Sequence, residues 1–365
     1  MAIGVEVQPQ VLQASAFAAH EEVMNKRDAY KFDRARMPWY GLLSKNKKER
    51  HFTRGKVIEK LQRDGGLELQ LWQRKEVLDF DETFIDDEMV WDPFRGHIGL
   101  EVAHADLEDR GFVVTPNEKH NGKNIGSSIP SAAGDVLIDY FAAQIDDMMD
   151  AYDVRHDELL LRDGTQSSLA PAGLDAIMPL DNTTGEIAGK SRADALFRHI
   201  VIPGSTTGAS GSLERDINRG VRLAEENTRG FPANIDFIMV GDDWLDAYVN
   251  YAKANGLRYM KDLDANPGVD IGIPDSRIIW NDIPVVRNPT FRRLDSQGFF
   301  TGTPWGKRGY FIASRCWELA YQKGKDKHFS APMDSSDQRM SRLSLDSRYA
   351  LICKKPNSQF LSTIA

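Results

Sequence analysis

The residues of this sequence with the most chemical potential are carboxylates that lie close together. Six acids fall between residues 79 and 88: Asp79, Asp81, Glu82, Asp86, Asp87 and Glu88. Hard cations such as calcium prefer carboxylate oxygens, but the stretch lacks the central glycine and the alternating ligand spacing of an EF-hand loop. The pattern therefore predicts a solvated or partner-facing loop and no metal site.

A second group of acids recurs farther along the chain: Asp146, Asp147, Asp150 and Asp153. Paired carboxylates can do acid–base chemistry when their environments differ. These four recur along what would be the polar face of one helix, which is typical of a solvated surface. No catalytic role is predicted for them.

Histidines, cysteines and glycines offer no better site. His97 and His104 are seven residues apart, without the helical i, i+4 spacing of a catalytic zinc site. Cys316 and Cys353 stand in no paired motif, and no Gly-x-Ser-x-Gly elbow occurs. Residues 204–212 resemble a phosphate-binding loop but lack its lysine, so a hinge is the better interpretation. We predict no catalytic, cofactor-binding or metal-binding residue, and no enzyme.

Charge is distributed unevenly although the whole chain carries −8. Residues 26–63 hold thirteen Lys or Arg against four Asp or Glu, and residues 76–92 hold eight acids and no base. Such blocks are either solvated faces or surfaces for partners of opposite sign. The basic block could contact DNA, without the helix-turn-helix or zinc-finger frame that reads sequence. Because the blocks nearly cancel, we favour the acidic loop of a neighbouring copy as its partner.

Size and composition indicate a folded protein of the reducing cytosol. The chain has 365 residues, 41% of them hydrophobic, which is enough for a core in one large domain or a few lobes. Neither a signal peptide nor a run of about 18 apolar residues is found. Two cysteines argue against a disulfide framework.

The first half of the chain is predicted to hold an arm, a hairpin and a long helix. Residues 1–50 look like an arm, with a short helix at 8–25 and a break at 37–41, where Pro and Gly interrupt helices. Residues 67–72 alternate apolar and polar, and 88–91 and 97–102 are further strand candidates. Apolar residues at spacings of three and four over 131–161 predict a helix of about 45 Å.

The second half is predicted to be mixed α/β. Helices are expected at 213–229 and 244–255 and strands at 235–240, 278–280 and 283–286. Three further strands are expected near the end, at 310–313, 317–321 and 349–353.

This order of elements resembles the major capsid proteins of tailed bacteriophages, the Hong Kong 97 fold. Short stretches are similar to the family at matching places: DELLLRDGT at 157–165, AGLDAI at 172–177, FIMV at 237–240, IPVVRNP at 283–289 and YALICKKPN at 349–357. The resemblance covers most of residues 50–360 and depends on the order and spacing of these motifs. It implies an α+β capsid fold with an N-terminal arm (1–65), an extended loop (66–114), a peripheral domain (115–204) with a spine helix (131–161), an axial domain (205–305) and returning strands (306–365).

The same resemblance implies function and partners. The chain is expected to build the icosahedral head of a tailed double-stranded DNA phage from hexamers and pentamers, assembled in the host bacterial cytoplasm. An arm of about 50 residues is too short for a fused scaffold, so a separate scaffolding protein is implied. A portal protein, a decoration protein and packaged DNA bound without sequence specificity are the other expected partners, and no membrane is expected. Some relatives cross-link lysine to asparagine, for which Lys75 and Asn357 are the candidates here.

Two alternatives stay open at this point. An encapsulin-type nanocompartment shell would share the fold and enclose cargo enzymes in place of a genome. An α/β enzyme that uses the acidic clusters would instead be a monomer or small oligomer with a deep polar pocket.

Overall fold

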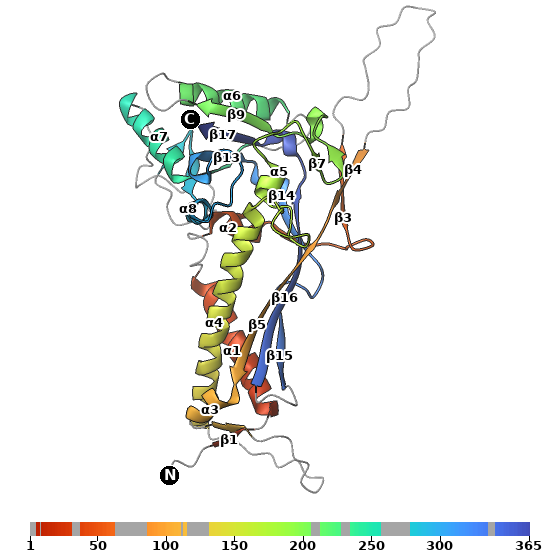
Figure 1. Cartoon of the computed structure of the whole chain (residues 1–365), viewed down its shortest axis with the longest axis vertical. Coiled ribbons are helices and arrows are strands. Elements are labelled where there is room, and N and C mark those ends of the chain that lie inside the picture. Colours follow the sequence, from red (N-terminus) through yellow and green to blue (C-terminus); the bar gives the residue numbers. More distant parts are fainter. Residues whose placement is uncertain are drawn as a thin grey trace, which may run out of the picture. The chain divides into compact units, whose positions relative to one another are not determined.

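The computed structural model describes most of the chain as two compact units. It covers residues 5–7, 9–30, 37–62, 86–110, 112–114, 131–205, 212–227, 234–256, 278–334 and 340–365. The first unit comprises Met1–Phe32, Arg95–His156 and Lys323–Arg348, and the second comprises Asp33–Phe94, Asp157–Gln322 and Tyr349–Ala365. Figure 1 shows their elements.

The first unit combines long strands with two long helices. Its elements are β1 (Val5–Val7), α1 (Pro9–Tyr30), β5 (Phe94–Ala103), α3 (His104–Asp109), β6 (Phe112–Val114), most of α4 (Ser131–Leu161), β15 (His328–Asp334) and the first part of β16 (Met340–Cys353). Strand β16 pairs with β15 and β5, and β1 pairs in parallel with β6. Helix α1 packs on β15, where the Phe17 ring lies edge-on to Phe329 and the His20 ring stacks on it.

Helix α4 has the bounds that the periodicity predicts, 31 residues from Ser131 to Leu161. Most of its apolar stripe is buried, with Leu137, Phe141 and Ile145 fully enclosed, but Val136 at its start is 53% exposed. Asp139, Asp146, Asp147 and Asp150 are exposed, as a solvated polar face requires. Asp153 departs from this pattern, because it is buried and its Oδ1 lies 2.6 Å from Lys327 Nζ.

The second unit is built on a six-stranded mixed sheet. Its strands run in the order β11-β12-β10-β13-β17-β9. They are β9 (Ile200–Ser205), β10 (Phe237–Val240), β11 (Ile279–Trp280), β12 (Ile283–Arg287), β13 (Arg308–Ile312) and β17 (Phe360–Ile364). Neighbours are antiparallel except β10–β12 and β17–β9.

Helices cover both faces of this sheet. Helices α6 (Ser212–Glu226) and α7 (Asp242–Ala254) share one core with Phe311 of β13 and Phe360 of β17. Helix α8 (Pro289–Ser296) packs through Phe291 on Tyr310, the residue before Phe311. Successive side chains of a strand point to opposite faces, so α8 lies on the face away from α6 and α7.

The remaining elements of the second unit form a smaller sheet and two hairpins. Strand β14 (Trp317–Tyr321) pairs with the end of β16 and, in parallel, with β2 (Lys47–Glu49). The others are α2 (Pro38–Lys45), β3 (Val57–Gln62), β4 (Asp86–Trp91), α5 (Leu174–Ile177), β7 (Glu186–Ile187), β8 (Lys190–Ser191) and short 3-10 turns at Ala195–Phe197, Trp305–Lys307, Ser314–Cys316 and Pro356–Ser358. In the part of the chain described, no helix is long and apolar enough to cross a membrane.

The prediction that residues 37–41 break any helix was wrong. Helix α2 begins at Pro38, because proline is well tolerated in the first turn, where its missing N–H would have no partner. Trp39 is fully buried, with its ring edge-on to Trp317 and its Nε1 donating to the Leu160 carbonyl at 3.1 Å. Residues 37–43 are therefore part of the packed second unit and not of a free arm.

The other predicted elements are present where the structure describes them. Helices at 8–25, 213–229 and 244–255 appear as α1, α6 and α7, and the predicted strands after residue 86 appear as β4, β5, β10 to β14 and β16. Besides α2, the elements that the periodicity missed are β1, β2, β3, α3, β6, α5, β7, β8, β9, α8, β15 and β17. The strand predicted at 67–72 lies outside the described residues.

Candidate functional site

The candidate site is the root of the β3–β4 hairpin, where parts of the basic and acidic blocks meet. The two strands are antiparallel over six residue pairs, from Val57 opposite Trp91 to Gln62 opposite Asp86. Lys60 lies opposite Glu88, and Lys56 Nζ lies 3.1 Å from Asp92 Oδ1. Part of the opposite charge noted in the sequence is therefore neutralised within one chain.

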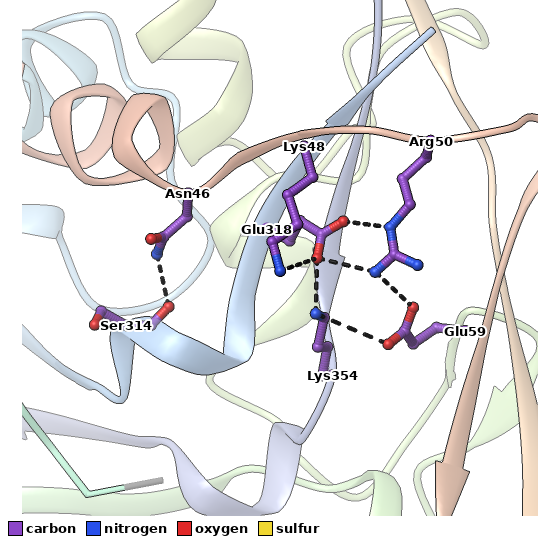
Figure 2. Close-up of polar contacts among 7 residues, drawn as sticks. All are labelled: Asn46, Lys48, Arg50, Glu59, Ser314, Glu318 and Lys354. Atoms are coloured by element: carbon purple, nitrogen blue, oxygen red, sulfur yellow. Dashed lines mark hydrogen bonds and ion pairs between the residues drawn. The ribbon is translucent and has the colours of Figure 1, made fainter. Parts of the chain in front are cut away.

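A buried carboxylate, Glu318 of β14, organises the β3 side of this root (Figure 2). Arg50 donates to it with two nitrogens, Nε to Oε1 at 2.6 Å and Nη2 to Oε2 at 3.0 Å. Lys354 Nζ lies 2.7 Å from Oε2, and Lys48 Nζ lies 3.8 Å from the same oxygen. A bidentate arginine–carboxylate pair is among the stronger charge-assisted hydrogen-bonded contacts, because two N–H groups align with the two carboxylate oxygens.

The same cations reach the hairpin through Glu59 of β3. Arg50 Nη2 lies 3.2 Å from Glu59 Oε2, and Lys354 Nζ lies 3.9 Å from Glu59 Oε1. In Figure 2 Arg50 and Lys354 stand between the two carboxylates. The network thus links β3 to β14, to the end of β16 and to the segment after β2.

The electrostatics of this network favour the charged form of Glu318. Burial raises the pKa of Glu318, but the hydrogen bonds from Arg50 and Lys354 and their charges outweigh it, so the pKa lies below its usual range. The hydrogen bond to Glu318 is also the main cause that raises the pKa of Arg50. The contact between Arg50 and Glu318 therefore favours the charged form of both residues.

A backbone contact holds the other strand of the hairpin. The Val90 amide of β4 donates to the Ala188 carbonyl at 3.0 Å. Ala188 sits in the turn between β7 and β8 with φ at 49°, a left-handed conformation. The root is thus held on the β3 side by side chains and on the β4 side by a main-chain hydrogen bond.

A second buried carboxylate fixes the segment that leads into this site. Asp157 of α4 accepts hydrogen bonds from the Tyr40 amide at 3.1 Å and from Thr290 Oγ1 at 2.6 Å, which joins α2 to α8. Burial raises its pKa to about 6, against the lowering effect of both hydrogen bonds. At the end of α2, Asn46 Nδ2 donates to the Ser314 carbonyl at 2.8 Å (Figure 2).

The structure brings few of the residues weighed for chemistry together. Asp86 and Glu88 lie in β4, whereas Asp79, Asp81, Glu82 and Lys75 lie outside the described residues. His97 Nδ1 lies 2.7 Å from Asp346 on the surface of the first unit. Among the described residues no group of three or more His, Cys, Asp or Glu could hold a metal ion.

The remaining candidates are buried or only partly described. Cys316 and Cys353 are buried free thiols, and burial raises the pKa of both. Asn357, the asparagine candidate for a cross-link, is buried in the turn before β17. Of the loop at 204–212, Gly204 and Ser205 end β9 and Ser212 begins α6.

Glu318, the residue at the centre of the network, was missed by reasoning from the sequence. A signal was present, since an acid stands alone in the otherwise apolar strand Trp317–Tyr321 and such a charge needs a cationic partner when buried. Arg50 lies in the basic block and Lys354 lies far from it in sequence. Only the pairing of β14 with both β2 and β16 brings the two cations together.

Comparisons with known proteins show the fold. No model of a known protein family matches the chain, and no curated protein is significantly similar to it. Among solved structures, the capsid asymmetric unit of cyanophage A-1(L) matches with a TM-score of 0.62 at 14% identity, covering 90% of this chain and 92% of that one. A structure of Mycobacterium phage Bobi matches with a TM-score of 0.51 at 11% identity, covering 89% and 90%. At these identities the likeness establishes a shared fold.

Proposed function

We propose that this chain, which has the Hong Kong 97-type α+β fold of phage capsid proteins, is the major capsid protein of a tailed double-stranded DNA phage. The observation that carries the proposal is the match over about nine tenths of both chains to the cyanophage capsid subunit. Its role is structural: many copies, as hexamers and pentamers, close into an icosahedral head.

The hairpin root supports a geometric mechanism. A two-stranded hairpin has little stability alone in water and needs a surface to lie on. Here the charge network ties β3 to β14 and the Val90 contact ties β4 to the turn between β7 and β8, so the root is held before any partner binds. A hairpin held in this way can lie across an adjacent copy, and many such weak contacts close a shell together.

The proposal includes a division of the chain and a set of partners. The division is an N-terminal arm (1–65), of which residues 37–43 are packed into the second unit, an extended loop (66–114), a peripheral domain (115–204), an axial domain (205–305) and returning strands (306–365). The partners are other copies of the chain, a separate scaffolding protein, a portal, a decoration protein and DNA held without sequence specificity. Assembly takes place in the host cytoplasm, and the protein ends in the virion without performing catalysis.

The test is electron microscopy of the purified chain, expressed alone and with its scaffold. Closed icosahedral particles are the expected result. Small oligomers under every condition, with scaffold included, would contradict the proposal and favour the α/β enzyme. Particles that form without scaffold and enclose an enzyme would instead identify the alternative with the same fold, an encapsulin-type compartment.

A further inference from the structure

Helix α6 of the second unit presents three arginines on one face. Arg215, Arg219 and Arg222 are exposed and stand at positions i, i+4 and i+7. Leu213 and Ile217 are buried in the core that the helix shares with the sheet. At 3.6 residues per turn the arginines lie opposite the buried side chains, so they point away from the sheet.

These arginines have few contacts within the described chain. The Arg215 side chain is 76% exposed, and its Nε lies 3.6 Å from the carboxylate of the adjacent Asp216. Arg222 Nε donates to the Asn218 carbonyl of its own helix, at 3.3 Å. Each guanidinium has five N–H donors, so most of this hydrogen-bonding capacity faces solvent.

Helix α7 presents the opposite charge at its beginning. Asp242, Asp243 and Asp246 occupy its first turns, and Asp243 and Asp246 are exposed. Asp242 is paired with Arg287, whose Nη2 donates to Asp242 Oδ2 at 2.9 Å. Among the residues that the structure describes, Asp243 and Asp246 form no ion pair, so this end of the helix keeps exposed negative charge.

Among the described residues, no ion pair joins the α6 arginines to Asp243 or Asp246 of the same copy. The start of α6 meets the end of α7, where Tyr251 Oη donates to Glu214 at 3.0 Å. Asp243 lies eight residues before Tyr251, about 12 Å along the helix. Helix α6 lies along β9 and β17 (Figure 1). Helix α7 contacts β11, where Tyr248 Oη donates to the Ile279 carbonyl. The two sets of charges are therefore not paired with each other within one copy.

We propose that the α6 arginines of one copy bind the α7 aspartates of the next copy around a capsomer. This inference rests on the proposed function and names a contact between its axial lobes. Two different surfaces of each copy are used, and such a head-to-tail contact repeats around a ring. Arginine suits this role because its planar fork matches a carboxylate with two hydrogen bonds.

The test reverses each surface separately. One variant carries Arg215→Glu and Arg219→Glu, the other Asp243→Arg and Asp246→Arg, and capsomer yield is measured by native gel and sedimentation. Like charges facing each other across an interface are strongly unfavourable, so each variant should lose at least about tenfold in yield. Circular dichroism checks that the subunits are folded, and Lys323→Glu with Lys325→Glu, exposed in the first unit, is the matched control expected to assemble.

Two rescues make the result specific. All four changes in one chain restore opposite charges at every contact, so hexamers and pentamers should return. Mixing the two variants restores the contact only where they alternate, which is possible in a ring of six but not all round a ring of five. Hexamers without pentamers is therefore the expected result of the mixture.

Other outcomes would overturn the inference without touching the proposed function. The contact is wrong if either variant folds and assembles like the wild type, or if neither rescue restores capsomers. If the Arg215→Glu and Arg219→Glu variant formed shells but held DNA less tightly in a salt titration, the α6 surface would be a phosphate-binding surface. Failure of the wild type to form shells would instead reject the proposed function itself.

Discussion

Two buried carboxylates of the second unit differ in what their surroundings do to ionisation. Asp157 accepts from a backbone amide and a threonine hydroxyl, and burial raises its pKa to about 6. Glu318 is also buried, but Arg50 and Lys354 touch it directly and its pKa is lowered. Direct contact with cations therefore favours the charged form of Glu318, whereas burial favours the protonated form of Asp157.

The titration of Asp157 predicts a pH dependence of stability. Its pKa is about 6 in the folded protein and 3.8 for an unperturbed aspartate side chain, so the folded state binds the proton more tightly. This contribution is fully present below about pH 4 and is lost as the pH rises toward 6. A shift of about two pKa units corresponds to about 3 kcal/mol.

We therefore expect Asp157→Asn to reduce this dependence. The amide keeps an acceptor for Tyr40 and cannot ionise, so the variant should gain about 2–3 kcal/mol relative to wild type as the pH rises from 4 to 7. Urea unfolding of unassembled subunits across this range measures the difference. Asp150→Asn, an exposed position on the same helix, is the control, and an equal pH response in both variants would contradict the prediction.

Glu318 predicts a local effect at the hairpin root. Glu318→Gln removes the charge that holds Arg50 and Lys354, and we expect a loss of about 1–3 kcal/mol because hydrogen bonds to charged groups are worth that much. Hydrogen exchange at the β3 amides should speed up, while exchange in β10 should not change. Glu101→Gln is the control, since the Glu101–Arg342 pair is 56% and 53% exposed and such pairs contribute little. Equal effects of the two variants would rule out the proposed role of Glu318 in holding the hairpin root.

At the scale of elements, α2 positions the segment that leads into β2, the strand that pairs with β14. The helix is only eight residues long and could not persist alone. Trp39 holds α2 in place by packing edge-on against Trp317 and by donating a hydrogen bond from Nε1 to the Leu160 carbonyl. Arg50, one of the cations that contact Glu318, follows five residues after the end of α2. The position of α2 therefore constrains the position of Arg50.

This arrangement predicts a graded response at Trp39. Trp39→Ala should cost about 3–5 kcal/mol, the range for removing a large buried aromatic side chain. Trp39→Phe should cost about 1–3 kcal/mol, because it keeps a ring but leaves the Leu160 carbonyl without its donor. Thermal or urea unfolding of the subunit compares the two, and equal losses would show that the retained ring contributes nothing beyond the hydrogen bond.

At the scale of the whole molecule, the basic and acidic blocks are paired in part within one chain, and the rest of the acidic block is predicted to contact a neighbouring copy. Near the hairpin root, Lys56 pairs with Asp92 within the chain, and Lys60 stands opposite Glu88 on the paired strand. Asp79, Asp81 and Glu82 come before β4 in the chain and lie outside the described residues. The neighbour contact predicted for the acidic block is therefore best tested at these positions.

We expect Asp79→Lys, Asp81→Lys and Glu82→Lys together to reduce assembly and to alter its response to salt. Surface charges attract partners over about 10 Å at 0.1 M salt, so the wild type should assemble less readily as salt rises. Light scattering during assembly over a salt series measures both effects. Serine at the same three positions removes charge without reversing it and should have a smaller effect. Unchanged assembly with an unchanged salt response would exclude the contact.

Sequence periodicity determined the elements that depend on local pattern. Helix α4 has its predicted bounds, because an unbroken apolar stripe from residue 136 onward specifies a helix without help from distant residues. The same reasoning failed for α2, where a proline was interpreted as a break although it starts the helix. Strand β17 was missed, because a strand buried on both faces shows no period of two.

The candidate sites depended on the tertiary structure. Glu318, Arg50 and Lys354 lie up to 304 positions apart, and only the pairing of β14 with β2 and β16 joins them. The sequence by itself determined the order of elements, the uneven charge and the absence of any recognisable catalytic motif. Only the tertiary structure decided which charges are matched within one copy and which remain exposed on α6 and α7, because charge pairing depends on distance in space and not on separation along the chain.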